Sequence, residues 1–236
     1  MCRIKYMAIG LCLMFSCMVW RANAQIQITG DGPDIEVLYQ YVVRTGLEGQ
    51  VEVHMPMKLL RKQDNFRMEL TTQGTGQKIG NTSVALRKLD QQGGMVIVFN
   101  ENEQTYSRTV STAPVYPWKA EEFSIQVLGE AKMHELDCDL VEATHASGLR
   151  FLYWVTRKFT LYEAVMDLYN LSREQYSDPI WAAMRAEGVY GTIVRMEQTA
   201  NDGTGMVMDL VSVKRGHLPE TLFQVPPNYK EIELAY

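Results

Sequence analysis

The sequence predicts an α+β protein in which an antiparallel sheet carries a short helical insert against one face. First, apolar and polar residues alternate with period two in several segments, as they do in strands that have one buried face. Second, glycine, asparagine and aspartate separate these segments at hairpin-like intervals. Third, the period changes to that of a helix between Phe159 and Gly188. Helices that accompany an antiparallel sheet cover one of its faces.

Residues 1–24 have the order of a secretory signal peptide. Arg3 and Lys5 give a positive start, an apolar run follows from Ala8 to Trp20, and Ala22-Asn23-Ala24 is a small-x-small cleavage signal. The apolar run is too short for a transmembrane helix. We therefore expect a removed leader over residues 1–24 and a single domain over residues 25–236. Lipoprotein processing at Cys17, or an uncleaved anchor, is the alternative.

The expected mature chain is acidic and has one cysteine. The leader contains three of the four cysteines and three of the 23 basic residues, but none of the 28 acidic residues. The remainder has 20 basic and 28 acidic residues, a formal net charge of −8 where the full chain has −5. Such a chain is poorly suited to nucleic acid, which requires clustered lysine and arginine. No internal disulfide can form, and no later segment is apolar enough to span a membrane.

The first half of the chain is expected to form antiparallel strands. Gln50–Leu59 alternates along its whole length, which predicts a strand with one buried face. The further strands are expected at Phe66–Leu70, Ser83–Leu89, Met95–Phe99 and Thr105–Val110. The run Met95–Phe99 is apolar throughout, so we expect both of its faces to be buried.

The second half adds more strands around the helical insert. They are expected at Phe123–Met133, Glu135–Thr144, Leu149–Thr156, Val189–Thr199 and Met206–Arg215. The final pair is joined by Asn201-Asp202-Gly203, a strong hairpin turn signal.

The helical insert is expected over Leu161–Glu187. Thr160 and Glu163 form a capping box for a first helix. Asp178-Pro179 is an N-cap followed by proline in the first turn of a second helix, which Gly188 ends.

No catalytic residue, metal site or cofactor site is predicted. Cys138 alternates with acidic residues and points to the apolar side of its strand, where burial and negative charge disfavour the reactive thiolate. The four histidines are scattered without metal-ligand spacing. GTGQKIG at residues 74–80 lacks the ending of a phosphate loop, and GDGPD at residues 30–34 is too short for a defined calcium loop.

Methionine is the one suggestive feature of the composition. Ten methionines remain after the leader, and methionine suits surfaces that adapt to varied apolar ligands, although it also fills ordinary cores. If a ligand site exists, we expect it between the insert and the sheet, with Trp181 at its mouth. The expected lining is Met55, Met57, Met68, Met166, Trp181, Met184 and Met196.

Motifs spread over most of the mature chain resemble a bacterial family called domain of unknown function 4412. They are NFRMEL, QTYSR (Gln104–Arg108), Leu128-Gly129, Cys138, Gly148, Trp154-Val155-Thr156 and the ending HLPETLFQVPPNY. Asn228 stands where glycine is expected before Tyr229, and both residue types tolerate a left-handed backbone.

That family is similar to the lipoprotein-carrier (LolA-like) group. The resemblance implies an incomplete barrel, a curved antiparallel sheet with the helical insert packed on its concave face, in which relatives hold acyl chains. The family has no established activity, and fold does not fix function.

Two classes of function therefore remain open. The first is an exported protein of the periplasm or outer-membrane periphery that binds a lipid or lipoprotein acyl chain without catalysis. The second is a structural or protein-interaction module of the cell envelope whose core is full. Connected apolar free volume of about 300 Å³ or more would favour the first.

Overall fold

The computed structural model describes residues 26–45, 51–72, 81–88, 95–110, 118–158, 179–200 and 204–233. The strands and helices within them are β1 Gln27–Thr29, β2 Asp34–Thr45, β3 Val51–Lys62, β4 Asn65–Thr72, β5 Asn81–Lys88, β6 Met95–Asn100, β7 Thr105–Val110, η1 Ala120–Glu122, β8 Phe123–Met133, β9 Leu136–His145, β10 Arg150–Thr156, α2 Pro179–Ala186, β11 Thr192–Thr199, β12 Gly205–Gly216, η2 Glu220–Phe223 and β13 Lys230–Glu231. The expected leader, the first expected helix and the turn at residues 201–203 lie outside the described residues.

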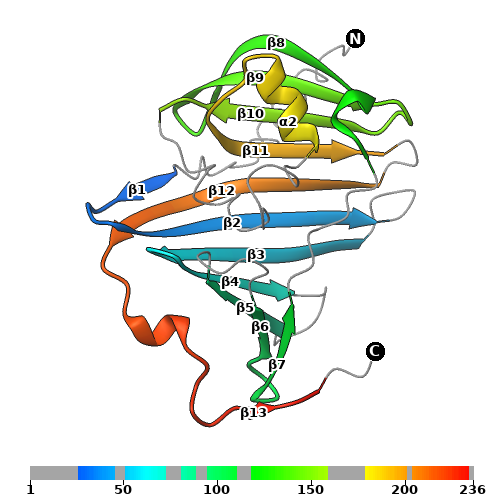
Figure 1. Ribbon diagram of the computed structural model, residues 1–236. Helices are drawn as coiled ribbons and strands as arrows, with labels where there is room; N and C mark the ends of the chain where they lie inside the picture. Colours follow the sequence, from blue (N-terminus) through cyan, green and yellow to red (C-terminus); the bar gives the residue numbers. More distant parts are fainter. Residues whose placement is uncertain are drawn as a thin grey trace, which may run out of the picture.

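The described strands form one continuous sheet, which is open. Its order is β13-β7-β6-β5-β4-β3-β2-β12-β11-β10-β9-β8, and β1 pairs with β12 beside this path. The pairings are antiparallel except those of β1 with β12 and β13 with β7. Figure 1 shows the strands turning progressively between the two ends of the sheet, which curves it. The predicted curved antiparallel sheet with a short helix is therefore confirmed.

The centre of the sheet consists of β2 and β12, which join residues far apart in the sequence. They pair from Asp34 with Gly216 to Arg44 with Gly205. One edge of β12 is shared, because β11 pairs with its first half and β1 pairs with Ser212–Lys214. An irregularity between Leu210 and Ser212 separates the two halves. Sequence reasoning did not predict β2.

Two predicted strands differ in the structure. Val98 is 37% exposed, so the apolar run of β6 is not buried on both faces as expected. β11 begins at Thr192, and the expected strand residue Val189 instead follows α2, where its N–H donates to the Met184 carbonyl oxygen at 3.0 Å. This bond ties Val189 to the end of α2, although its apolar side chain had suggested the start of a strand.

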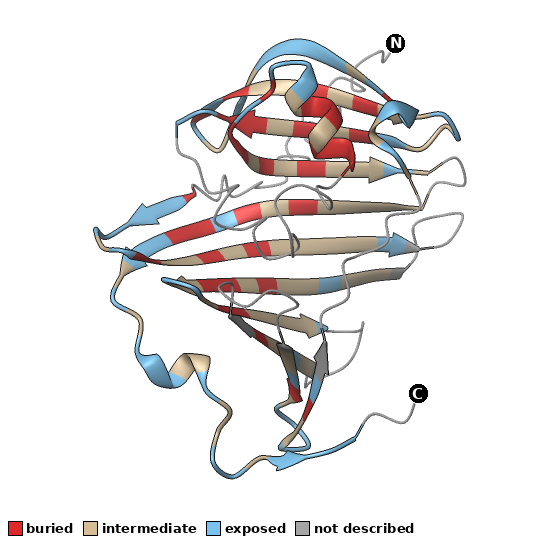
Figure 2. Cartoon of the chain, viewed as in Figure 1, coloured by how far each residue is buried: buried red, intermediate tan, exposed pale blue. Residues whose placement is uncertain are grey.

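Helix α2 begins and ends where the sequence predicted. Pro179 is its first residue, and Gly188 follows its end with a φ of +78° that favours glycine. Its buried residues are Pro179, Ile180, Trp181, Ala183 and Met184. The helix contacts η1 and β8, and Figure 2 shows its buried stretch facing the strands β8–β11.

Hydrophobic cores form on both faces of the sheet. The larger core includes α2 and the apolar side chains of β2, β3 and β9–β12. The smaller core contains Val84, Leu86 and Phe99, with Tyr229 packed against them. Val84 is paired with Glu69 of β4, and Glu69 is paired with Lys58 of β3, so these three side chains share a face. Lys58 lies between Met57 and Leu59, which belong to the larger core and point to the other face. The smaller core therefore lies on the face opposite the larger one.

Tyr229 belongs to a C-terminal strap, residues 217–233, which leaves β12 and ends beside β7 (Figure 1). The buried carboxylate of Asp34 accepts a hydrogen bond from the Leu218 N–H at 2.8 Å, and Lys62 donates to the Leu218 carbonyl oxygen at 2.6 Å. Further along, Arg67 donates to the Leu222 carbonyl oxygen at 3.0 Å. These bonds hold the strap over the outer face, by which we mean the face opposite the larger core.

Candidate functional site

One face of the sheet carries an unbroken row of large apolar side chains, which we call the methionine row. It is formed by Tyr153, Met196, Met208, Tyr41 and Met55, each paired with the next across β10, β11, β12, β2 and β3. Because directly opposite residues in antiparallel strands share a face, these five side chains are neighbours. The row crosses the middle of the sheet.

Burial changes along the methionine row. Tyr153 is 5% exposed, and Met196 and Met208 are each 8% exposed. Tyr41 and Met55, at the other end, are only partly buried. The methionine row is thus closed at its Tyr153 end and more open at its Tyr41 and Met55 end.

Parallel rows extend this apolar face. Leu210, Tyr39, Met57 and Leu70 are paired in turn across β12, β2, β3 and β4. Since Tyr39 and Met57 are two residues from Tyr41 and Met55, both rows lie on the same face. Met68 lies opposite Leu59, on that face as well.

The face is electrically neutral where the two rows meet β2. The Tyr39 hydroxyl donates to the Ile193 carbonyl oxygen at 3.3 Å, and burial raises the pKa of this phenol. Tyr39 therefore stays uncharged at any physiological pH. A neutral, polarisable surface of this kind suits an apolar ligand.

The opposite face of the same strands is charged. Arg195 forms ion pairs with Asp209 at 2.7 Å and Glu197 at 2.6 Å, and it stacks over the Trp154 ring at 5.7 Å from the centroid. These residues are one position out of phase with Met196, Met208 and Tyr153, so they point away from the methionine row. At β10–β12 the sheet therefore has an apolar face and a charged one.

The structure brings most of the predicted lining residues together. Met55, Met57, Met68 and Met196 share the apolar face, and Trp181 and Met184 of α2 pack in the same core as Met57 and Met196. Trp181 is 3% exposed and Met184 is 0% exposed, so Trp181 belongs to packed core rather than to the mouth of an opening. Met166 lies outside the described residues.

Sequence reasoning missed Tyr39, Tyr41 and Met208 as members of this face. A signal was available for the tyrosines, because Ile35, Val37, Tyr39, Tyr41 and Val43 alternate along β2. For Met208, the neighbouring residues Met206 and Leu210 gave the same alternation. What the sequence could not give was the register that places these residues beside Met196 and Met55.

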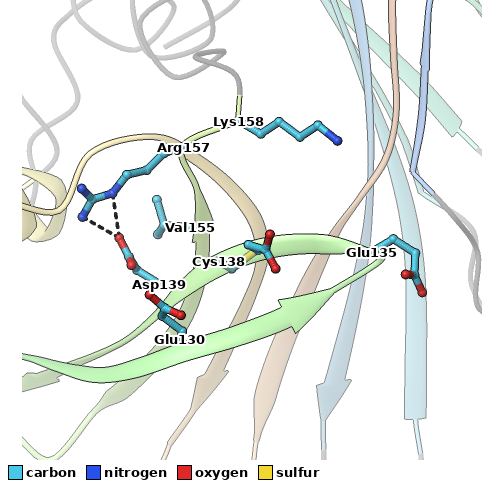
Figure 3. A pocket seen from close by; sticks show the side chains of 8 residues that line it. Glu130, Glu135, Cys138, Asp139, Val155, Arg157 and Lys158 are labelled. Atoms are coloured by element: carbon cyan, nitrogen blue, oxygen red, sulfur yellow. Dashed lines mark hydrogen bonds and ion pairs between the residues drawn. The ribbon is translucent and has the colours of Figure 1, made fainter.

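A hollow of about 390 Å³ lies elsewhere, near the β8–β9 hairpin (Figure 3). Its lining is mostly charged and consists of Glu130, Glu135, Asp137, Cys138, Asp139, Val155, Arg157 and Lys158. Arg157 bonds Asp139 at 2.8 Å, as Figure 3 shows. Of the predicted lining methionines that the structure describes, none lines this hollow.

Cys138 is buried next to the hollow, in surroundings that disfavour the reactive thiolate. It is 3% exposed, and its thiol lies 3.6 Å from the Leu136 carbonyl oxygen. Burial, with the negative charges of Asp137 and Asp139, raises the pKa of the thiol to about 11. The predicted core role of this cysteine is confirmed. Among the described residues, no group of three or more His, Cys, Asp or Glu side chains could hold a metal ion.

The described part of the chain contains no helix with the length and apolar character of a membrane span.

Comparison with protein families gave one match to the sequence. The model of the family Domain of unknown function (DUF4412) matches residues 47–229. A search of curated proteins found no match to the chain.

Several solved structures share part of the architecture. An uncharacterized conserved protein from Thermus thermophilus is 12% identical, with 89% of this chain and 92% of that chain covered and a TM-score of 0.46. A domain described as an outer membrane lipoprotein-sorting protein from Vibrio parahaemolyticus is 10% identical, with coverages of 86% and 92% and a TM-score of 0.35. The MucA/MucB complex of Pseudomonas aeruginosa contains a chain that is 9% identical, with coverages of 91% and 61% and a TM-score of 0.42. Likenesses at these TM-scores do not define a function.

Proposed function

The chain belongs to the DUF4412 family, and we propose that it is a non-catalytic module of the cell envelope that binds an apolar ligand, a lipid or an acyl chain. The observation that carries this proposal is the methionine row with its partly buried end at Tyr41 and Met55. The signal-peptide pattern of residues 1–24 supports export to the periplasm or outer-membrane periphery.

The ligand is proposed to lie against β12, β2 and β3 on the concave side of the sheet, rather than beneath α2. Under α2 the core is already closed, since Met184, Val141 and Val194 are each 0% exposed. At Tyr41 of β2 and Met55 of β3 the apolar face is only partly buried. Each methylene of a ligand that is buried there contributes about 0.8 kcal/mol, so a short length of acyl chain would bind detectably.

The helical insert is proposed to pack on this same concave side. The insert includes α2, whose buried residues join the larger core. The chain after the leader is proposed to be a single domain, because the described strands form one continuous sheet.

A second candidate function is a structural or protein-interaction module whose core is full. The closed packing under α2 favours it, and so does the position of the hollow, which is charged and lies away from the methionines. The two candidates differ in whether the open end of the methionine row takes up a ligand.

Two measurements test the proposal. Native mass spectrometry of the protein recovered from the envelope of an expressing bacterium should show a co-purified lipid. Uptake of a fluorescent fatty acid should fall at least about tenfold in Met55→Asp, because a carboxylate on the apolar face must be desolvated. His54→Asp is the matched control, because His54 is exposed on the other face of the same strand.

The control should bind the fatty acid like the unaltered chain. Absence of co-purified lipid, together with equal uptake by Met55→Asp and His54→Asp, would favour the full-core alternative. Circular dichroism of both variants establishes that each has folded.

A further inference from the structure

The edge of β7 that does not face β6 pairs with a short strand from the chain's own C-terminal strap. Lys230 donates its N–H to the Gln104 carbonyl oxygen at 3.0 Å, and Ile232 donates to the Tyr106 carbonyl oxygen at 2.8 Å. β13 thus runs parallel to β7 and extends the sheet by one strand. This is the geometry by which extended peptides add to an exposed sheet edge.

Side chains on one face of the sheet at this edge contact the strap as well. The Tyr106 hydroxyl donates to the Glu231 carboxylate at 2.8 Å, and Arg108 lies 3.4 Å from the same carboxylate. The Tyr229 ring packs edge-to-face on Phe99, with centroids 5.4 Å apart. The edge therefore accepts an aromatic residue and, two positions later, an acidic one.

The Phe99 ring, which the aromatic residue contacts, is held in place by its neighbours. It is 2% exposed, and the Arg67 guanidinium stacks on it at 5.4 Å from the ring centroid. Arg67 is itself fixed by Glu69 at 2.6 Å and by the Leu222 carbonyl oxygen at 3.0 Å. The aromatic contact thus rests on β4 and β6, two strands within the sheet, and sites built on strands hold their geometry better than sites on loops.

The described part of the chain's own strap pairs with only one end of this edge. β13 pairs with Thr105 and Tyr106, two of the six residues of β7. Residues 230–233 are all exposed, and the ion pair of Glu231 with Arg108 is 49% exposed on each side. Exposed ladder bonds and a solvent-exposed ion pair stabilise little, so detaching this end of the strap costs far less than unfolding the sheet.

We propose that the β7 edge is a strand-addition site for an extended segment of another protein, which displaces residues 229–233. The segment that fits carries an aromatic residue followed two positions later by Asp or Glu, as Tyr229 and Glu231 do. Running parallel to β7, it can continue past Tyr106 toward Val110 and form ladder bonds that the described residues of the strap do not form. The site lies on the opposite side of the sheet from the methionine row, so it does not depend on the proposed lipid function.

The test uses a fluorescently labelled synthetic peptide of residues 222–233, LFQVPPNYKEIE, and measures its binding to the full chain by fluorescence anisotropy. In Ile232→Pro the chain's own strap loses the N–H that bonds Tyr106, while the β7 edge is unchanged. We expect this variant to bind the peptide at least about tenfold more tightly than the unaltered chain, because competition by the tethered strap lowers the apparent affinity.

Two further variants identify the contacts, both made together with Ile232→Pro. Arg108→Gln should weaken binding measurably, by up to about fivefold, since it removes the exposed cation that faces the peptide's acidic residue. Arg150→Gln removes an exposed arginine on β10, far along the sheet order from β7, and should leave binding unchanged. We also expect a peptide with glutamine in place of that acidic residue to bind Ile232→Pro with reduced affinity. Its affinity should equal that of the unaltered peptide for the variant that carries both Ile232→Pro and Arg108→Gln.

Three results would overturn the proposal. The first is no binding of the peptide to Ile232→Pro at about 1 mM. The second is binding that Arg108→Gln and Arg150→Gln affect equally. The third comes from light scattering. A concentration-dependent dimer of the unaltered chain that the peptide dissociates would assign the edge to the strap of a second copy, exchanged between molecules, instead of to another protein.

Discussion

Replacing Arg67 with methionine should detach the middle of the C-terminal strap. The Arg67 side chain is 9% exposed and contacts Glu69, Glu101 and the Leu222 carbonyl oxygen. Methionine has a similar length and keeps the apolar contact with Phe99, so the change removes the charge and its hydrogen bonds. The strap then loses the one side-chain bond that the described residues make to Leu222.

The expected cost is about 3 kcal/mol of the free energy of unfolding. The Leu222 carbonyl oxygen left without its donor costs about 1 kcal/mol or more. The stacking of the guanidinium on Phe99 contributes about 0.5–1 kcal/mol. Glu69, whose side chain is 17% exposed, keeps Lys58 at 3.0 Å but loses its second cation, which adds about 1 kcal/mol.

Urea unfolding followed by tryptophan fluorescence measures this loss. The matched control is Arg44→Met, because Arg44 also pairs with a glutamate, Glu52 at 2.9 Å, but has a side chain 52% exposed. The control should lose less than about 1 kcal/mol. If the two variants lose the same free energy, Arg67 does not hold the strap over the smaller core, and the reasoning is wrong.

Three further predictions follow from the described contacts. Cys138, whose pKa is raised by burial to about 11, should react with a thiol reagent near pH 8 only after unfolding in urea; rapid labelling of the native chain would contradict this. Gly191→Ala should cost more than about 2 kcal/mol in thermal melting, because its Cβ would lie 2.2 Å from the Thr156 carbonyl oxygen, whereas Gly188→Ala, with open space around it, should cost about 1 kcal/mol. Burial alone would raise the pKa of Glu69. Hydrogen bonds from Lys58 and Arg67 outweigh burial and lower the pKa below 4.5. The stability from ionised Glu69 is therefore complete above pH 4.5 and lost as the pH falls below it, so the difference in unfolding free energy between the unaltered chain and Glu69→Gln should shrink with acidification; a constant difference would argue against this coupling.

The sequence predicted local structure well where one rule dominated. The alternation of Gln50–Leu59 placed β3, and Pro179 and Gly188 placed both ends of α2. These signals depend on residues a few positions apart, so the chain around them does not alter their meaning. The prediction that a strand begins at Val189 was wrong, because an apolar residue after a glycine fits the start of a strand and the end of a helix equally well.

The arrangement of the candidate site needed information that the sequence does not contain locally. Met196, Met208 and Met55 are neighbours only because of the register of β11, β12, β2 and β3. A shift of one residue would place each methionine on the polar face. The strap was missed for a different reason. It has no periodicity, and it is held by Arg67, a residue type that sequence reasoning places at the surface.

The pairing of β2 with β12 has a consequence for how the chain folds. These central strands bring residues 34–45 against residues 205–216, so the middle of the sheet cannot close until nearly the whole chain has been made. β1 adds to this, because its only described partner is the last half of β12. Contacts between such distant residues make folding slow. If residues 1–24 are the export leader that the sequence predicts, slow closure would keep the polypeptide extended during passage across the membrane and delay folding until it has arrived.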